Sequence, residues 1–300
     1  TDSTQETGVA IYFPDEGEKS GFPAGEISEI EIEWVTGDII IMAKDVTCMD
    51  YKNCRLCPRQ CGVDRSAGQI GFCRCPDTAL VAKTMLHKWE EPVLAGSGGS
   101  GAIFFGGCTL GCSYCQNRAI STAPVGTPAD SDSLRRIMEE LIRQGAENID
   151  LVTPTQFLPT IIPALRNPLP VPVVYNCGGY ERVETVQALE GLVDIWLPDL
   201  KYADDTLAQS LSGAKDYFSY ASAAIRQMVK QTGTPLWQGE KLKKGVVIRH
   251  LILPGHVENS LKVLDWIGEN FAPGQVLVRP VTAATCPASA CSAAVNFAPE

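Results

Sequence analysis

The chain has 300 residues, of which 45% are hydrophobic and 20% charged, and its formal net charge is −10 with a pI near 4.9. This composition is typical of a globular protein with a core of ordinary size, and such an acidic chain is not expected to bind nucleic acid, which needs a basic surface. No run approaches the roughly 20 apolar residues of a membrane-spanning helix, and the start TDSTQETGVA lacks the parts of a signal peptide, so we expect a cytoplasmic protein without a membrane partner.

Residues 1–47 are expected to form an N-terminal extension with a small β-hairpin. Residues 29–35 alternate strictly between polar and apolar side chains, and the apolar run IIIMA follows at 39–43. Alternation of this kind is typical of a half-buried strand. Residues 48–100 are rich in cysteine, glycine and proline, which predicts a loop segment held together by metal rather than by a core.

The chain has twelve cysteines, which in a protein of a reducing compartment more often bind metal or act in catalysis than form disulfides. Six lie in the segment 48–100 and three in the stretch 108–115. Cys177, Cys286 and Cys291 are scattered. The clustering favours two metal sites.

From residue 101 to 282 short apolar runs alternate with amphipathic segments, which predicts repeated βα units. The predicted strands are residues 102–105, 149–153, 171–175, 193–199, 245–253 and 275–281. The predicted helices are residues 131–145, with Ser131 or Ser133 as its cap and Gly145 at its end, and those in 182–191, 220–231 and 258–270. Because no G-x-G-x-x-G follows the first strand, the fold class expected is an α/β partial (β/α)6 barrel with a small N-terminal cysteine-rich metal-binding segment.

The stretch GGCTLGCSYCQN, residues 106–117, follows the first predicted strand directly. Its cysteines, Cys108, Cys112 and Cys115, therefore lie at the carboxyl end of the barrel, where βα folds place their chemistry. Thiolates are the usual ligands of a [4Fe–4S] cluster, and three of them leave one iron free to bind a substrate or cofactor. Glycines 106, 107 and 111 allow the tight turns that such a loop needs. A zinc site or a few buried thiols are the alternatives.

The C-x3-C-x2-C spacing, with Tyr114 before the last cysteine, resembles the signature of radical S-adenosylmethionine (SAM) enzymes, and most closely the pyruvate formate-lyase activating enzyme-like iron–sulfur proteins. The resemblance spans about residues 51 to 280 and includes CRLCPRQCGVDR, HKWEEP, NIDLVTPT, GGYE, LVDIWLPDLKYAD and VIRHLILPG. It implies an oxidoreductase that takes an electron from an external reductant and cleaves SAM at a [4Fe–4S] cluster to form a 5′-deoxyadenosyl radical. The radical would abstract hydrogen from a glycine of a partner protein, another protein side chain or a small molecule.

The resemblance also implies the residues that bind the cofactor at the ends of successive strands. Of Arg249 and His250, which alternate on the fifth strand, it favours His250 as the interior residue near the ribose. An ordinary ion pair is the alternative role for Asp199 and Lys201. Cys177 is a core residue or a neighbour of the cofactor, and His87 is a structural histidine or a residue of the substrate opening. The implied cofactor-binding residues are Tyr114, Asn117, Thr153, Thr155, Asn176, Asp199, Lys201 and His250.

Cys54, Cys57, Cys61 and Cys73 form a C-x2-C-x3-C-x11-C pattern. Four thiols complete the coordination of zinc or of an auxiliary iron–sulfur cluster, and spacing does not distinguish the two. Cys48 or Cys75 can replace one ligand. Such a closed site suggests a structural or electron-relay role.

The carboxyl end, residues 283–300, departs from the resemblance. Its alanine-rich sequence lacks the Gln-aromatic-x-Pro stretch with which the family continues, so the closure of the last barrel strand is in question. Two functions from other classes stay open: a non-catalytic iron–sulfur or zinc protein that binds a partner, and an electron carrier.

Overall fold

The structure is a computed structural model that describes residues 30–35, 38–43 and 49–281. The chain divides into two compact units, Thr1–Thr47 and Cys48–Glu300. In the first unit β1 (Ile30–Val35) pairs antiparallel with β2 (Asp38–Ala43), as the alternating pattern predicted. Cys48 and the predicted tail 283–300, with Cys286 and Cys291, lie outside the described residues.

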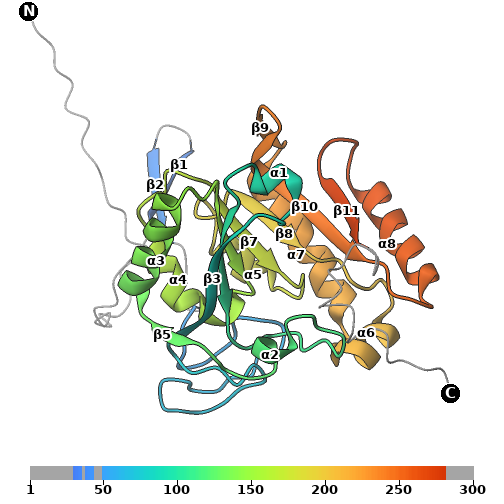
Figure 1. Cartoon of the computed structure of the whole chain (residues 1–300), viewed down its shortest axis with the longest axis horizontal. Helices are drawn as coiled ribbons and strands as arrows, with labels where there is room; N and C mark the ends of the chain where they lie inside the picture. Colours follow the sequence, from blue (N-terminus) through green and yellow to red (C-terminus); the bar gives the residue numbers. More distant parts are fainter. Residues whose placement is uncertain (1–29, 36–37, 44–48, 282–300) are drawn as a thin grey trace, which may run out of the picture. The chain divides into compact units, whose positions relative to one another are not determined.

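The second unit is built on one sheet whose order is β11-β10-β8-β7-β6-β4-β3-β5, with β9 on β10 (Figure 1). The six strands β4, β6, β7, β8, β10 and β11 are parallel neighbours and follow one another across the sheet in chain order. A doubly wound sheet would reverse its strand order at a switch point, and this one does not. The partial (β/α)6 barrel is therefore confirmed. The strands are β3 Ala79–His87, β4 Ser100–Phe105, β5 Thr127–Ala129, β6 Ile149–Val152, β7 Val173–Cys177, β8 Ile195–Pro198, β9 Leu236–Gln238, β10 Lys241–Leu251 and β11 Leu277–Val281.

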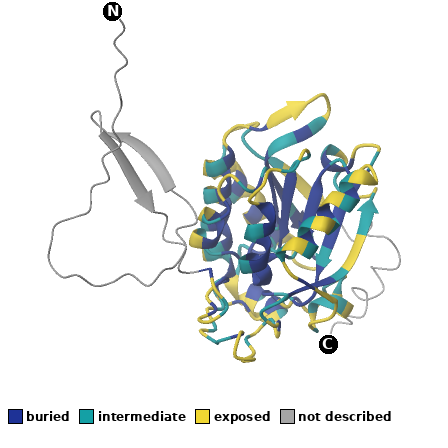
Figure 2. Ribbon diagram, turned by 90° about the vertical axis from the view of Figure 1, so that its left-hand side faces the viewer, coloured by how far each residue is buried: buried dark blue, intermediate teal, exposed yellow. Residues whose placement is uncertain are grey.

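Helices connect the parallel strands and cover one face of the sheet, so that the strands are the most deeply buried part of the unit (Figure 2). Short helical segments within loops, and the eight-residue helices α4 and α6, were not predicted, because their sequences are short or weakly amphipathic. The helices are α1 Pro92–Ala95, α2 Arg118–Ser121, α3 Ser131–Arg143, α4 Leu158–Leu165 after the 3-10 turn η1 Thr155–Phe157, α5 Val183–Gln187, α6 Asp205–Ser212, α7 Tyr217–Thr232 and α8 Val257–Asn270. None of the described helices is long and apolar enough to cross a membrane.

Two sequence expectations about local structure are corrected. The sheet begins before residue 101, because β3 lies inside the segment predicted as loop and pairs antiparallel with β4. The cap of α3 is Asp130 rather than a serine: its Oδ1 accepts a hydrogen bond from the backbone N–H of Ser133 at 2.8 Å. A carboxylate at this position satisfies an otherwise unpaired N–H and favours the helix dipole.

The inner face of the sheet changes along the strands: an apolar layer is followed, nearer the carboxyl ends of the strands, by a polar layer. Side chains two residues apart on a strand point to the same face, so Val174 and Asn176 share the inner face of β7, as Val247 and Arg249 do on β10. The short helix α1 supplies Leu94 to the apolar level. This cluster consists of Leu94, Val174, Ile195, Leu197, Leu242 and Val247. We call this cluster the apolar floor, and the polar residues of the inner face follow directly after it along the strands.

Residues 49–78 of the cysteine-rich segment form neither helix nor strand, as predicted, and two arginines attach this part to the barrel. Arg59 donates hydrogen bonds to the carbonyls of Thr109 and Leu110 in the cysteine loop and of Ser212 and Gly213 at the end of α6, at 2.6–3.1 Å. A planar guanidinium can bond several carbonyls at once, which an ammonium cannot do in the same geometry.

Arg65 is almost fully buried and makes the second attachment. It donates to the carbonyls of Cys75 at 3.0 Å, of Gln156 at 2.7 Å and of Pro76, and its guanidinium lies 4.5 Å from the ring centroid of Tyr51. The segment is thus held to η1 by a cation whose donors are satisfied without a carboxylate.

Candidate active site

The cysteine loop leaves β4 at the carboxyl end of the parallel strands, at the lower edge of the unit in Figure 1. Gly107 and Gly111 have φ angles of 75° and 76°, a region that L side chains rarely adopt. A Cβ on Gly107 would lie 2.2 Å from Cys75 Sγ. The backbone therefore turns where the sequence predicted, and only glycine fits the first of these turns.

Two sulfurs of the loop have hydrogen-bond donors beside them, and the thiols of the loop influence one another. Burial and the neighbouring thiols of Cys112 and Cys115 raise the pKa of Cys108 to about 11. The backbone N–H of Leu110 lies 3.4 Å from Cys108 Sγ, and Ser121 Oγ lies 3.3 Å from Cys115 Sγ. Such donors stabilise thiolate charge, which ligation requires.

No three His, Cys, Asp or Glu side chains among the described residues surround one point as the ligands of a single metal ion do. A [4Fe–4S] cluster does not need that arrangement, because each thiolate ligates a different iron and the sulfurs stand apart around the cluster. Three interacting thiols on one glycine-containing loop are therefore a donor set that fits three corners of such a cluster.

A polar cluster lies beside this loop, formed by the inner-face residues that follow the apolar floor. Arg249 donates through Nε to Asp199 Oδ1 at 2.9 Å and through Nη2 to Asn176 Oδ1 at 2.6 Å. Lys201 Nζ lies 2.5 Å from Asp199 Oδ2. We call Asn176, Asp199, Lys201 and Arg249 the mouth cluster.

The charges of the mouth cluster reach the cysteine loop. Burial raises the pKa of Cys112, and Lys201 is the strongest influence that opposes this rise. Burial would also raise the pKa of Asp199, but Lys201 and Arg249 outweigh it and hold that pKa below its ordinary value. Asp199 is therefore an anion between two cations, next to a thiol of the loop.

The structure brings Arg249, and not His250, into this cluster. His250 points to the opposite face of β10, where Nδ1 lies 2.6 Å from the carbonyl of Leu200 and Nε2 lies 2.9 Å from Ser260 Oγ. Since a carbonyl only accepts, Nδ1 carries the hydrogen. Burial lowers the pKa of His250, which keeps the imidazole neutral. The expectation that His250 faces the interior was therefore wrong, because its neighbour on β10, Arg249, faces the interior instead.

Asp150 and Glu90 extend the polar interior; the sequence places Glu90 beside His87 as a possible residue of the substrate opening and does not point to Asp150. Asp150 is fully buried on β6 and accepts a hydrogen bond from Asn176 Nδ2 at 3.3 Å, while Glu90 Oε1 lies 3.6 Å from Arg249 Nη1. Burial, followed by the charge of Glu90, raises the pKa of Asp150 well above its usual range. A lone aspartate within the apolar strand run IDLV was the available signal.

Other predicted cofactor residues are divided between the site and its surroundings. Tyr114 OH lies 2.6 Å from Tyr202 OH, which fixes the ring beside the cysteine loop. Asn117 is the N-cap residue of α2 but makes no side-chain capping bond. Thr153 has a φ of 58° and donates its backbone N–H to the carbonyl of Asn176 at 2.8 Å, so it adjoins the mouth cluster.

Thr155 and Cys177 belong instead to the helix-facing side of the sheet. Thr155 Oγ1 donates to Glu181 Oε1 at 2.7 Å and accepts from Tyr175 OH at 3.0 Å. Cys177 is buried on the same side, and burial raises the pKa of its thiol. The core interpretation of Cys177 is the one this geometry favours, and Thr155 is part of a buried hydrogen-bond chain.

Glu181 ends that chain, and its titration gives a prediction. Burial raises its pKa to about 8, so the folded protein holds this proton to a higher pH than the unfolded chain does. Stability should then fall as pH rises from about 4.5 to 8. Glu181→Gln keeps an acceptor for Thr155 but cannot ionise. We expect the difference in free energy of unfolding between variant and wild type to change by roughly 4 kcal/mol in favour of the variant from pH 5 to pH 9.

Urea denaturation at the two pH values measures this difference, and groups common to both proteins cancel. A pH-independent difference would mean that Glu181 ionises as an ordinary carboxyl in the folded state.

The four amino-terminal cysteines do not all converge. Burial raises the pKa of Cys57, and the charges of Cys73 and Cys54 add to this rise. Cys61 Sγ instead lies 3.3 Å from the backbone N–H of Phe72. A hydrogen bond from Cys75, then Arg65, lower the pKa of Cys73 to about 6. The second metal site stays a prediction.

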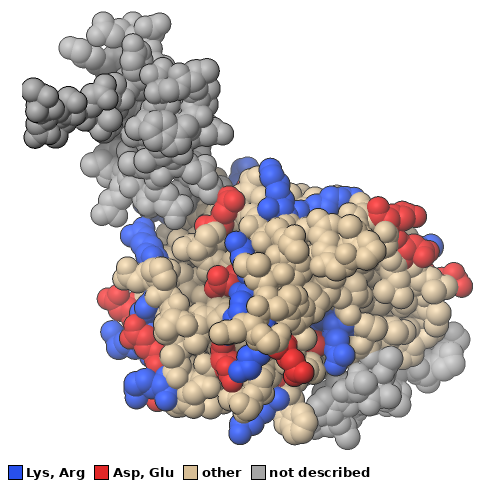
Figure 3. Space-filling view, turned by 90° about the horizontal axis from the view of Figure 1, so that it is seen from above, with Lys and Arg blue, Asp and Glu red and all other residues tan. Residues whose placement is uncertain are grey.

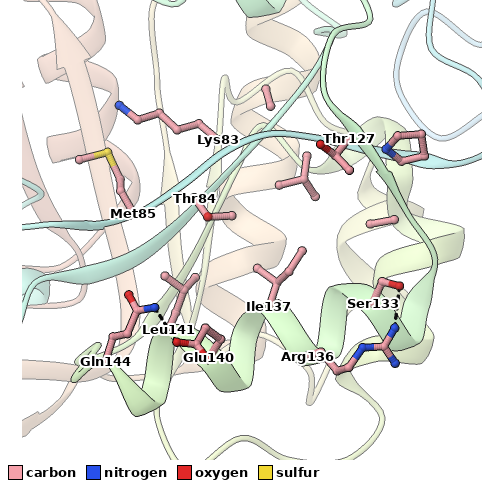
Figure 4. Close-up of a pocket in the computed structure, with 14 residues that line it drawn as sticks. Lys83, Thr84, Met85, Thr127, Ser133, Arg136, Ile137, Glu140, Leu141 and Gln144 are labelled. Carbon is pink, nitrogen blue, oxygen red and sulfur yellow. Dashed lines mark hydrogen bonds between the residues drawn. The ribbon is translucent and has the colours of Figure 1, made fainter.

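A hollow of about 800 Å³ lies elsewhere on the unit, between β3, β5 and α3. Its lining residues are drawn in Figure 4. Lys83, Thr84 and Met85 line one wall, and the α3 side chains Ile137 and Glu140 line the other. None of the predicted site residues borders it. His87, at the far end of β3, has a buried Nδ1 without a hydrogen-bond partner among the described residues and lies away from the cysteine loop.

Comparisons with known proteins agree with the location of the cysteine loop. Residues 94–158 match the model of a 4Fe-4S single cluster domain, and this stretch contains all three cysteines of the loop but none of the amino-terminal set. The predicted iron–sulfur cluster is thereby supported.

Among solved structures, Streptococcus suis SuiB bound to S-adenosylmethionine is similar with a TM-score of 0.40 and 15% identity, over 55% of this chain and 36% of that chain. Methylornithine synthase (PylB) is similar with a TM-score of 0.41 and 16% identity, over 60% of this chain and 52% of that one. The chain thus spans between about a third and a half of these proteins. Scores of this size leave fold and function to be argued from the chain itself.

A closer relative is the Methanocaldococcus jannaschii protein named Uncharacterized protein MJ0674. It is 30% identical in an alignment of 255 positions that covers 80% of this chain and 69% of that protein. Identity of this level over most of both sequences identifies homologues that share a fold. The chain therefore belongs to the same protein family as MJ0674.

Proposed function

We propose that the chain is a radical SAM enzyme in which Cys108, Cys112 and Cys115 hold a [4Fe–4S] cluster with one open iron. The observation that carries the proposal is the mouth cluster beside the cysteine loop: an anion and two cations at the carboxyl end of a partial barrel. SAM has an amino and a carboxylate group on one end, and this arrangement of charges complements them. When bound, the cluster supplies the electron that cleaves SAM to methionine and a 5′-deoxyadenosyl radical.

The residues of the chain would bind and orient SAM and shield the radical from water. Asp199 can accept hydrogen bonds from the amino group of SAM, and Lys201 can donate to its carboxylate. Arg249 holds Asp199 and Asn176 in fixed positions, so that little side-chain entropy is lost on binding. The apolar floor around Leu94 closes the barrel interior at the other end, which limits access of water to a radical.

Anaerobic reconstitution, reduction with dithionite and addition of SAM test the proposal. We expect release of 5′-deoxyadenosine and methionine. Lys201→Met should raise the KM for SAM at least about tenfold, because a hydrogen bond to a charged group is lost, while the iron content is kept. Lys241→Met is the matched control, because Lys241 also forms an ion pair, with Glu147 at 2.7 Å, away from the site.

A fully loaded, reduced protein that forms no 5′-deoxyadenosine would exclude the enzyme and leave a non-catalytic iron–sulfur protein or an electron carrier.

The resemblance to activating enzymes supports hydrogen abstraction from a glycine of a partner protein as the reaction. Addition of a glycyl-radical enzyme to the reduced protein with SAM should then produce a protein-centred radical in electron paramagnetic resonance spectra. Continued formation of 5′-deoxyadenosine without that signal across several such enzymes would indicate a different substrate.

A further inference from the structure

The outer edge of β3 is only partly covered. β4 pairs with one side of β3 over residues 81–87, whereas β5 pairs with the other side over residues 79–81 only. Among the residues that the structure describes, no strand pairs with this outer side beyond Val81. Unpaired N–H and C=O groups along a strand edge are a template for a further strand. The last part of β3 is therefore an open sheet edge.

The chain before β5 leaves this edge open because it turns away. A Cβ on Gly126 would lie 2.7 Å from the backbone carbonyl carbon of Val81, so the chain still touches β3 at that point. One residue earlier it lies against the end of β4, since a Cβ on Gly106 would clash with the carbonyl oxygen of Val125. Gly126 has a φ of 143°, which permits this change of direction. No part of the β5 connection therefore runs along the rest of the edge.

The hollow drawn in Figure 4 lies against the open edge. Residues 81–85 of β3 border it on one side, and residues of α3 and its carboxyl end, from Ser133 to Gln144, border it on the other. Five extended residues span about 17 Å, and this part of α3 rises about 16 Å, so the two walls match in length. We call the hollow with its open edge the β3 groove. It has the length of about five residues of extended chain.

An extended segment added to this edge would alternate its side chains between two faces. On one face they would meet Lys83 and Met85, which alternate with Thr84 along β3 (Figure 4). On the other they would meet Thr84 and, across the hollow, Ile137 of α3. Each face therefore offers one apolar side chain for contact. Main-chain hydrogen bonds to a strand edge supply affinity, and side-chain contacts of this kind supply selectivity.

The cations beside the β3 groove are exposed and have no carboxylate within ion-pair distance among the described residues. They are Lys83 and Arg136, of which Arg136 donates to Ser133 Oγ at 2.9 Å. The one acidic side chain that lines the hollow, Glu140, is already paired with Arg143. On the face seen from above, by contrast, Lys and Arg are interspersed with Asp and Glu (Figure 3). Two unpaired cations in a chain of net charge −10 favour an acidic ligand at this groove.

We propose that the β3 groove binds an extended acidic segment of a partner protein, which adds one strand to the sheet. The open edge and the matched length of the walls favour an extended chain, and the unpaired cations favour acidic over basic side chains. The inference goes beyond the proposed function and does not depend on it, because none of the predicted site residues borders the hollow.

Two labelled eight-residue peptides test the groove: one alternates valine with glutamate, and the other alternates valine with lysine. Their Kd values for the anaerobically reconstituted full chain are measured by fluorescence anisotropy at low and high salt. The groove variant Lys83→Glu/Arg136→Glu is compared with the control Arg166→Glu/Lys230→Glu, which makes the same change of charge at two exposed cations after α4 and on α7. Hydrogen exchange of the wild type with and without the acidic peptide locates the bound segment.

We expect the acidic peptide to bind wild type saturably at low salt and the groove variant at least about tenfold more weakly, with the difference shrinking as salt screens the charges. The basic peptide should show the reverse preference, which an unfolded variant would not produce. The control should bind both peptides as wild type does. The bound acidic peptide should slow the exchange of backbone amides in residues 82–87, because main-chain hydrogen bonds protect them.

Three results would overturn the proposal: no saturable binding of the acidic peptide to wild type, equal binding of it to wild type and to the groove variant, or protection confined to other segments. A dimer of the free protein that the groove variant loses would also overturn it, because a second copy of the chain would then cover the edge.

Discussion

Replacement of Cys108, Cys112 and Cys115 together by alanine should abolish cluster absorbance and reduce 5′-deoxyadenosine formation to background. All three protein ligands of the proposed cluster are removed, and no other described thiol lies in the loop. The barrel should stay folded, because the loop is attached by Arg59 to backbone carbonyls rather than to the sulfurs. Iron counting, visible absorbance and circular dichroism measure the three outcomes.

Cys177→Ala is the matched control, since it removes a buried thiol from the opposite face of the sheet and should leave the cluster intact. Metal that the triple variant retains would report on the amino-terminal cysteines, and elemental analysis identifies it as zinc or iron. Persistence of the cluster absorbance in the triple variant would refute the assignment of its ligands.

Replacement of Arg65 by alanine should lower the free energy of unfolding by about 3 to 5 kcal/mol, because several hydrogen bonds from a buried cation are lost together. Three carbonyls that accept from Arg65 would lose their donor, and the rings of Tyr51 and Phe157 would lose a cation above them. Lysine should restore only part of this stability, because an ammonium cannot donate in the same plane to all three carbonyls. Urea denaturation followed by circular dichroism gives the difference.

Arg143→Ala is the control for the loss of a guanidinium. The Arg143 side chain is 72% exposed and pairs with Glu140 one turn away on α3, so its removal should change stability by less than about 0.5 kcal/mol. Equal effects of the two substitutions would mean that Arg65 contributes no more than a surface cation.

The parallel strands β4, β6, β7 and β8 and the second half of β10 were predictable because both of their faces are buried, which makes each one a short continuous apolar run. The same property hid the register of β10. Alternation shows that Arg249 and His250 face opposite sides, but it does not show which side is the interior when both sides exclude water. β3 was missed for another reason: its sequence ALVAKTMLH follows a cysteine-rich loop and carries no clear period.

The site was predictable where it depends on local spacing and not where it depends on distant partners. The cysteine loop is encoded within ten residues, and its glycines adopt the turns expected of them. Glu90 lies in the turn after β3 and Asp150 on β6, 60 positions apart, and only the folded sheet brings both near Arg249. Arg59 and Arg65 were not singled out either, because carbonyl oxygens have no sequence signature.

The attachments made by Arg59 have a consequence for engineering. A compact cysteine-rich segment that precedes a barrel resembles a module that could be deleted or transplanted. The guanidinium of Arg59 in this segment, however, is the donor for carbonyls of both the cysteine loop and the end of α6. Excision of the segment would leave those oxygens unpaired within the barrel, so the smallest portable unit must contain the segment and the barrel together.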